Sequence, residues 1–331
     1  MLNILQAVTI PEYKDETEAI IAAVASGHIR TAAKLISRIE RDEEGVVPIL
    51  QALYRMGGNS RVVGVTGPPG AGKSTLISRL VAHWRKQGLR VAVLAVDPSS
   101  PFSGGAVLGD RLRMAHHSGD KGVFIRSMAS RGHLGGLSRA TGDALTVLEA
   151  MPWDVVLIET VGVGQNETDI MRHASVVVLL QTPMGGDDVQ AAKAGINEIG
   201  DIFVVNKSDH HEADRTVQML KEMIALGQSL HAERIWCPPV LKTQASLGEG
   251  VAELAQQIDR FFLEYKDGSN AAYQRRRAQT RHRVGEILRD LLDRRIRSDD
   301  STWLDAIVDP IVERQRDPYE IAIEMLARIS S

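Results

Sequence analysis

The sequence predicts an α/β fold with a mostly parallel central sheet and helical extensions at both ends. Helical stretches alternate with short apolar runs, and five such runs span residues 62–66, 90–96, 154–158, 176–180 and 202–205. These runs are apolar throughout, which is typical of strands buried on both faces of a parallel sheet covered by helices. A weaker sixth run, residues 239–241, follows them.

Helical spacing dominates the two ends of the chain. Apolar side chains recur every three or four positions in residues 14–56, and a breaker cluster at 57–60 separates them from the first apolar run. A linker-like segment at 266–270 precedes a second helical region. We therefore predict a helical N-terminal extension at 1–58, a core at 59–265 and a helical C-terminal region at 266–331.

The C-terminal region carries one apolar stripe on a predicted helix. A stripe of this size must be buried, either against the chain's own core or against a second copy of the chain. The arginines around it, between residues 275 and 297, are expected on a solvated face. The members of the stripe are Val284, Ile287, Leu288, Leu291, Leu292 and Ile296.

Composition and charge narrow the function classes. The chain has 331 residues, 44% of them hydrophobic and 24% charged, which is typical of a globular protein. The formal net charge of -3 gives no electrostatic reason to expect a nucleic-acid partner. The single cysteine, Cys237, favours a reducing compartment. The first residues lack a signal-peptide pattern, and no apolar run approaches the roughly 18 residues of a membrane span, so we expect a cytoplasmic protein without a membrane partner.

A phosphate-binding motif follows the first apolar run. Residues 67–74 match the Walker A pattern GxxxxGK[ST], and a helical stretch follows. The glycines allow successive backbone N–H groups to point at phosphates, and the start of the helix adds its positive dipole end. We expect Lys73 to reach the β- and γ-phosphates as a catalytic residue and Ser74 to ligate Mg²⁺. The predicted phosphate-binding residues are Gly67, Pro68, Pro69, Gly70, Ala71, Gly72, Lys73, Ser74 and Thr75.

A second motif indicates which base is bound. Asn206, Lys207 and Asp209 form an NKxD sequence directly after the fifth apolar run, where α/β folds place ligands. The Asp209 carboxylate matches the N1–H and 2-amino donors of guanine, whereas adenine would leave it unmatched, at a cost of roughly 1–3 kcal/mol or more. Gln244 and Ala245 follow the sixth run, where GTPases place a loop whose backbone supports the guanine oxygen. The sequence therefore predicts a Mg²⁺-dependent GTPase that binds GTP and GDP.

Acidic residues follow two further runs. Glu159 and Gly162 end the third run in the position of the GTPase DxxG motif, although the acid here also fits a polar residue that caps a strand. Asp97 ends the second run close to the Walker loop, where a carboxylate can hold a metal-bound water. Asp110 lies in a glycine-rich loop, the kind of segment that a nucleotide switch requires. We predict that Ser74, Asp97, Asp110 and Glu159 surround the metal and that Glu159 also acts in catalysis.

Four segments together resemble one protein family. Residues 67–74, 96–101, 159–165 and 206–209 closely match the motifs of the MeaB/ArgK family, and the similarity covers essentially the whole chain, including residues 317–320. Its members are GTPase chaperones of adenosylcobalamin-dependent methylmalonyl-CoA mutase, formerly assigned as kinases of arginine and ornithine transport systems. The chain resembles bacterial members. The resemblance implies a P-loop fold, a methylmalonyl-CoA mutase as partner, and a homodimer formed through C-terminal helices.

The resemblance also implies roles for residues 185–193, which are similar to the family's third switch. Asp187, Gln190 and Lys193 would respond to the partner there, and Lys193 would reach the nucleotide as a conditional catalytic residue. Whether Asp187 or its neighbour Asp188 acts in this switch stays open.

Three functions remain open from the sequence. The first is a GTPase chaperone that gates cofactor loading and protects a cobalamin-dependent methylmalonyl-CoA mutase. The second is a metal-insertion or targeting GTPase, although the His-rich or CxC-type elements of metal-handling versions are absent from the sequence. The third is a kinase of a transport-system protein, for which the sequence offers neither an acceptor site nor a hydroxyl-orienting base. The destination of the γ-phosphate, water or a protein, separates the kinase from the first two.

Overall fold

The structure is a computed structural model that describes most of the chain. The chain divides into two compact units, residues 1–279 and 280–331, and each is described here by itself. The described residues are 14–97, 117, 119–129, 139–160, 170–183, 200–230, 236–265, 270–298 and 308–329.

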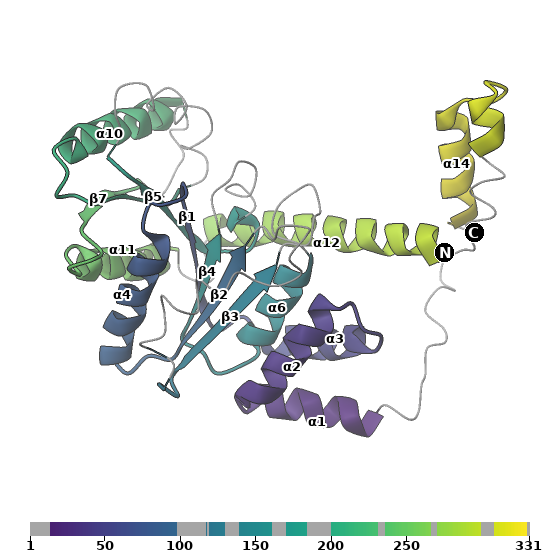
Figure 1. The fold of residues 1–331 in the computed structure, drawn as a ribbon, viewed down its shortest axis with the longest axis horizontal. Helices are drawn as coiled ribbons and strands as arrows, with labels where there is room; N and C mark the ends of the chain where they lie inside the picture. The colour runs from purple at the N-terminus through teal and green to yellow at the C-terminus, as the bar shows by residue number, and fades with distance from the viewer. Residues whose placement is uncertain are drawn as a thin grey trace. The chain divides into compact units, whose positions relative to one another are not determined.

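The first unit is built on a parallel sheet. Its seven described strands follow the order β3-β2-β4-β1-β5-β6-β7, and every neighbouring pair is parallel (Figure 1). All six predicted runs are strands, and the predicted α/β fold is confirmed. The strands are β1 (Arg61–Thr66), β2 (Val91–Asp97), β3 (Val123–Ala129), β4 (Val155–Thr160), β5 (Val176–Gln181), β6 (Ile202–Asn206) and β7 (Val240–Thr243).

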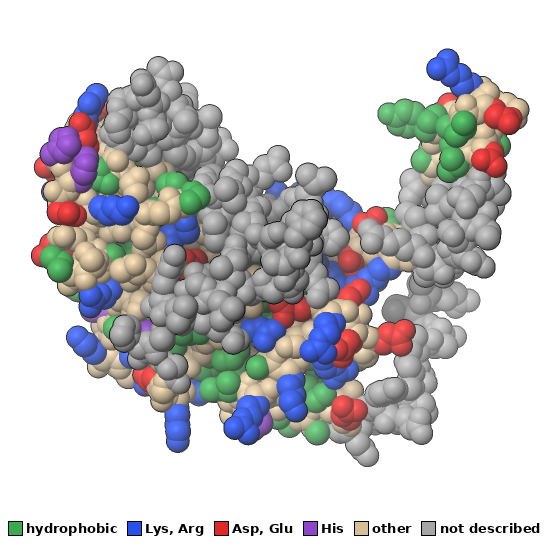
Figure 2. Space-filling model, viewed as in Figure 1, with side chains coloured by type: hydrophobic (Ala, Val, Ile, Leu, Met, Phe, Trp, Pro, Cys, Tyr) green, Lys and Arg blue, Asp and Glu red, His purple; other side chains and the backbone are tan. Residues whose placement is uncertain are grey.

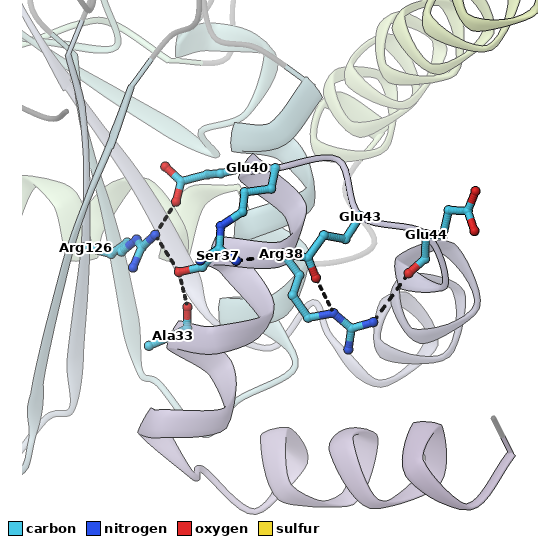
Figure 3. A network of polar contacts seen from close by, with 8 residues as sticks. Ala33, Ser37, Arg38, Glu40, Glu43, Glu44 and Arg126 are labelled. Carbon is cyan, nitrogen blue, oxygen red and sulfur yellow. Dashed lines mark hydrogen bonds and ion pairs between the residues drawn. The ribbon is translucent and has the colours of Figure 1, made fainter. Parts of the chain in front are cut away.

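The edge strand β3 is missing from the sequence prediction. Arg126 and Ser127 interrupt its apolar run, so it lacks the pattern of a strand buried on both faces. The Arg126 guanidinium forms an ion pair with Glu40 and donates a hydrogen bond of 3.1 Å to the Ser37 hydroxyl (Figure 3). Both partners belong to α2 (Ile29–Glu40). A charged side chain is tolerated in this strand because the edge of the sheet lets a neighbouring helix supply its partner.

Helices cover both faces of the sheet (Figure 1). α4 (Lys73–Lys86) and α11 (Val251–Glu264) pack on one face, and α6 (Arg139–Glu149) and α10 (Ala213–Leu230) pack on the other. Side chains of the central strands alternate between these cores, which explains why β1, β4, β5 and β6 are buried along nearly their whole length. The core under α4 and α11 contains Ile77, Leu80, Leu254 and Ile258.

The N-terminal helices share a core with the sheet. α1 (Lys14–Ala25), α2 and α3 (Val46–Met56) form a helical layer, and α2 and α3 pack on α6. The buried side chains of this layer include Ala32, Leu35, Ile36, Ile39 and Leu53, most of them at the helical spacing that the sequence shows. Among the described residues no single helix is long and apolar enough to cross a membrane, and one pair, 16–25 with 29–40, passes that test only jointly across a bend of 120°.

The first turns of α12 (Asn270–Ser298) are anchored at the starts of β5 and β6. Arg275 donates two hydrogen bonds of 2.8 Å to the carboxylate of Asp201, which directly precedes β6. Gln279 donates to two backbone oxygens of the turn before β5, at 2.8 Å each. Burial is the largest influence on the pKa of Arg275 and lowers it, but the Asp201 charge, the hydrogen bonds to Asp201 and the nearby Tyr265 together outweigh burial and hold that pKa above its ordinary value.

This anchor gives a first prediction. We expect Arg275→Met to lower the free energy of unfolding by about 2 kcal/mol, because it leaves the partly buried Asp201 carboxylate without its counter-charge. Chemical unfolding of the full chain measures the change. Arg277→Met on the exposed side of the same helix is the matched control and should have little effect. Equal effects from the two substitutions would show that the ion pair contributes nothing.

In the second unit the predicted apolar stripe is partly exposed. Val284, Leu288 and Leu291 are 59%, 56% and 55% exposed, and Ile287 and Leu292 are partly buried. An apolar surface of this kind on a helix is typical of a contact region.

α14 (Pro318–Ile329) also has exposed apolar side chains. The Asp317 carboxylate caps its first turn by accepting hydrogen bonds from the N–H groups of Tyr319 and Glu320, at 2.9 and 3.1 Å. Tyr319 is 82% exposed and Ile323 is 67% exposed, and apolar side chains gather on this helix in the space-filling view (Figure 2). The second unit thus presents apolar surface on both α12 and α14.

Candidate functional site

The predicted phosphate loop lies between β1 and α4, and glycines set its shape. Gly67, Gly70 and Gly72 have φ angles of 143°, 76° and 92°, in the region that favours glycine. A Cβ on Gly67 would lie 2.3 Å from the backbone oxygen of Leu180, and a Cβ on Gly72 would lie 2.4 Å from the amide nitrogen of Asn206. The loop therefore packs against β5 and β6 so closely that only glycine fits at these two positions.

Lys73 is folded back over this loop. Its Nζ donates hydrogen bonds to the backbone oxygens of Gly67 at 2.7 Å and Pro68 at 3.0 Å, and the residue is only 6% exposed. A buried ammonium group at the first residue of a helix creates a positive region together with the helix dipole. This region suits the binding of a polyanion.

Ser74 and Glu159 meet at the carboxyl end of the sheet. The Ser74 hydroxyl donates a hydrogen bond of 2.7 Å to Oε1 of Glu159, and both residues are buried. In the sheet register Glu159 lies beside Val65 of β1 and Ala95 of β2. The structure thus brings two predicted metal-site residues into contact, although they are 85 positions apart in the sequence.

Asn206 joins the phosphate loop to the last strand of the sheet. Its Nδ2 donates to the backbone oxygen of Ala71 at 2.7 Å, and its Oδ1 accepts hydrogen bonds from Thr243 Oγ1 at 3.0 Å and Ala245 N at 3.1 Å. Asn206 is 3% exposed, so these hydrogen bonds are shielded from water. The residue is therefore a structural link between the two halves of the site.

The other two residues of the NKxD sequence are exposed beyond β6. Lys207 adopts the left-handed region with a φ of 58°, which turns the chain sharply after the strand. The N–H of Ser208 donates to the backbone oxygen of Thr243 at 3.1 Å, and this bond holds the turn beside β7. Lys207 and Asp209 are therefore exposed at the carboxyl end of the strands, where the phosphate loop also lies.

Residues 243–249, which we call the base loop, form a closed turn that begins at the last residue of β7. Gln244 and Glu249 pair in an isolated antiparallel bridge, with a hydrogen bond of 3.2 Å from Gln244 N to Glu249 O. The N–H groups of Leu247 and Gly248 both donate to the oxygen of Gln244 at 3.0 Å. The predicted residues Gln244 and Ala245 are therefore part of a compact loop that Asn206 contacts directly.

Arg79 completes the support of the base loop and is absent from the sequence prediction. Its Nε donates to the backbone oxygen of Ala245 at 3.1 Å, and its Nη2 donates to the oxygen of Ser246. Arg79 lies on α4, about one and two-thirds turns after Lys73 by the usual helical period of about 3.6 residues. Arg79 is a single exposed arginine that belongs to no recognised motif, so the sequence alone does not predict its role.

Several predicted site residues lie outside the described residues. These are Asp110, Gly162 and Lys193, together with Asp187, Asp188 and Gln190 of the proposed third switch. Asp97 is the last residue of β2, next to the strand that carries Glu159, and Thr75 is exposed on the first turn of α4.

Ser74 and Glu159, which are in contact, fit a Mg²⁺ site in which the phosphates of a nucleotide supply some of the ligands. Mg²⁺ prefers oxygen ligands and is usually held by one or two side chains together with phosphates and water. Ser74 and Glu159 supply a hydroxyl and a carboxylate oxygen side by side. No group of three or more histidine, cysteine or acidic residues gathers among the described residues, so within them the protein does not build a complete metal cage by itself.

This geometry defines the class of protein. A loop whose conformation depends on glycines connects the carboxyl end of β1 to the start of α4. Asn206 connects that loop to the NKxD turn and to the base loop. The chain is a P-loop GTPase. A family model described as methylmalonyl Co-A mutase-associated GTPase MeaB matches residues 31–301, and the chain belongs to this family.

Individual relatives agree with this assignment. A protein of Pyrococcus horikoshii named as a GTPase is 44% identical over 312 residues, which cover 94% of this chain and 98% of that protein. GTPase ArgK of Escherichia coli is 37% identical over 248 residues, covering 73% of this chain and 74% of ArgK. The mitochondrial methylmalonic aciduria type A homolog of Mus musculus is 40% identical over 223 residues, covering 67% of this chain and 53% of that protein.

A solved structure shares the fold. The crystal structure described as LAO/AO transport system kinase aligns with a TM-score of 0.69 and 23% identity, and the alignment covers 98% of this chain and 100% of that one. At this identity the likeness concerns the fold alone.

Proposed function

We propose that this GTPase binds GTP with Mg²⁺, hydrolyses it to GDP and phosphate, and acts as a chaperone for a cobalamin-dependent methylmalonyl-CoA mutase in the cytoplasm. In this role it gates the loading of the cofactor and protects the mutase. The observation that carries the nucleotide site is the link made by Asn206, which ties the phosphate loop to the base loop. The family description, which names association with methylmalonyl Co-A mutase, supports the choice of partner.

The phosphates would lie along residues 67–75, at the start of α4. Lys73 would exchange its two bonds to loop oxygens for bonds to the β- and γ-phosphates, because a charge-assisted bond to phosphate is stronger than one to a neutral carbonyl. Ser74 and Glu159 would hold Mg²⁺, with Asp97 and Asp110 as further acids. When bound, the metal ion would neutralise charge on the phosphates.

The guanine base would lie between the NKxD turn and the base loop. Asp209 would accept hydrogen bonds from the base, and Lys207 would cover it. Ala245 would support the guanine oxygen, although its N–H currently donates to Asn206, so this loop must adjust or share that donor on binding. Gln244 would also lie at the base, and Gly162 would contact the γ-phosphate.

Hydrolysis would transfer the γ-phosphoryl group to water. Positioning and charge stabilisation supply most of the rate in such reactions. Lys73 would stabilise the developing negative charge, Glu159 would hold the metal-binding Ser74 in place, and Lys193 would reach the phosphates when the mutase binds. The partner would therefore control the rate of hydrolysis.

A binding experiment tests the partnership. The immobilised full chain is mixed with purified cobalamin-dependent methylmalonyl-CoA mutase in the presence of a non-hydrolysable GTP analogue or GDP. We expect retention of the mutase to depend on which nucleotide is present, because the proposed switch segments, the loop with Asp110 and residues 185–193, would respond to the γ-phosphate. Retention that is absent with every nucleotide would contradict the chaperone role and leave the GTPase activity untouched.

We also propose a homodimer that buries the stripe on α12. Leu288→Glu should dissociate the dimer, because a charge would replace a side chain buried between two apolar helices. Light scattering or sedimentation of the full chain should then give the mass of one chain, 36.2 kDa, in place of two. Leu263→Glu, at an exposed leucine of α11, is the control and should leave the dimer intact. A wild-type chain that is monomeric at micromolar concentration would contradict the dimer.

A further inference from the structure

The base loop is held by β6 and by α4. The phosphate loop contacts the first of these elements and leads into the second. Asn206 binds it from the sheet through Thr243 and Ala245, and Arg79 binds it from α4 through the oxygens of Ala245 and Ser246. The same helix begins with Lys73 and Ser74. One helix therefore carries the predicted phosphate contacts at its start and a clamp on the base loop further along.

We propose that Arg79 is a positioning residue for base recognition, which fixes the base loop relative to the phosphate-binding end of α4. This inference rests on the proposed function, since it assumes that the base loop contacts guanine. Arg79 touches neither base nor phosphate. It acts through Ala245 and Ser246, whose backbone it holds from the helix side.

The clamp is separate from what holds the fold together. α4 and α11 already pack through buried side chains such as Leu80 and Leu254, and the base loop closes on itself through its own backbone bonds. Ala245 packs in the core beneath α4 and α11, whereas residues 246 and 247 are exposed and bury no side chain there, so the position of this outer part of the loop relative to α4 depends on polar contacts. Loss of Arg79 should therefore change where the loop lies and leave the core unchanged.

The geometry of the guanidinium group makes arginine specific here. Its Nε and Nη2 donate to two successive carbonyl oxygens from one planar fork. A lysine would place a single ammonium group there and could not hold both oxygens with the same geometry. Arg79→Lys therefore removes the fork while it keeps the charge.

The test compares guanine and adenine nucleotides, which share the same phosphates. For Arg79→Gln and Arg79→Lys we expect the Kd of GDP to rise about fivefold, which corresponds to about 1 kcal/mol. The Kd of ADP, measured by competition, and the unfolding temperature should stay close to wild type. Preference for guanine over adenine should therefore fall.

Arg85→Gln is the matched control on the same helix. Arg85 donates to the Asp120 carboxylate and to the Leu89 backbone, away from the base loop. Its loss should lower the unfolding temperature and leave the ratio of the GDP and ADP affinities unchanged. An unchanged ratio in both Arg79 variants, or equal weakening of GDP and ADP, would overturn the positioning role. A wild-type chain without preference for GDP over ADP would instead overturn the proposed guanine site itself, and this inference with it.

Discussion

Replacing Lys73 with alanine is expected to lower the rate of GTP hydrolysis about a thousandfold, the upper part of the range for losing one group that stabilises transition-state charge. The ammonium group is buried at the start of α4 and is already held over the phosphate loop by Gly67 and Pro68. Once it exchanges these two bonds for bonds to the phosphates, it lies beside the developing negative charge. Triphosphate binding should weaken as well, since a charge-assisted contact is lost.

Phosphate release under saturating GTP measures this effect. Lys86→Ala, at an exposed lysine near the end of the same helix, is the matched control and should retain the wild-type rate. Because Lys73 also bonds to its own loop, the unfolding temperature of both variants should be compared. A Lys73→Ala protein that turns over GTP at the wild-type rate would remove this lysine from the reaction.

Replacing Asp209 with asparagine is expected to weaken GDP binding about a hundredfold and to favour xanthine nucleotides. Asp209 would accept hydrogen bonds from two donors of guanine, and each bond to a charged group contributes about 1.5–3 kcal/mol. Asparagine offers an amide N–H2 in place of one oxygen. This donor matches the carbonyl that xanthine carries where guanine has an amine.

The affinities of both proteins for GDP and XDP measure the change of preference. Asp214→Asn is the control, since Asp214 is also exposed nearby but pairs with Lys242. It should leave both affinities unchanged. Unaltered GDP binding by Asp209→Asn would place the base elsewhere.

The sheet could be predicted from the sequence where its strands are buried on both faces. β1, β4, β5 and β6 are continuous apolar runs because helices cover them on both sides. β3 could not be found this way, since Arg126 sits in its middle and pairs with Glu40 of a helix that is close in space but distant in the sequence. The local sequence pattern identifies a strand that is buried on both faces. It does not identify an edge strand whose polar side chains have partners on another element.

The site follows the same division. The Walker and NKxD motifs are short and local, so the sequence alone predicts Lys73, Ser74 and Asn206 as site residues. The contacts between them are not local. Asn206 reaches Ala71 across 135 positions, and Arg79 reaches Ala245 across 166. The roles of all these site residues stay predictions, and Asp110, Gly162 and Lys193 in addition lie outside the described residues.

Hydrolysis of γ-labelled GTP by the full chain, with and without purified methylmalonyl-CoA mutase, tests the central claim most directly. The account predicts that the label appears as inorganic phosphate and that saturating mutase accelerates its release. It also predicts that Lys193→Ala keeps the basal rate and loses most of the acceleration. Label transferred to a protein, or a rate that saturating mutase does not change, would contradict the proposal of a GTPase controlled by its mutase partner.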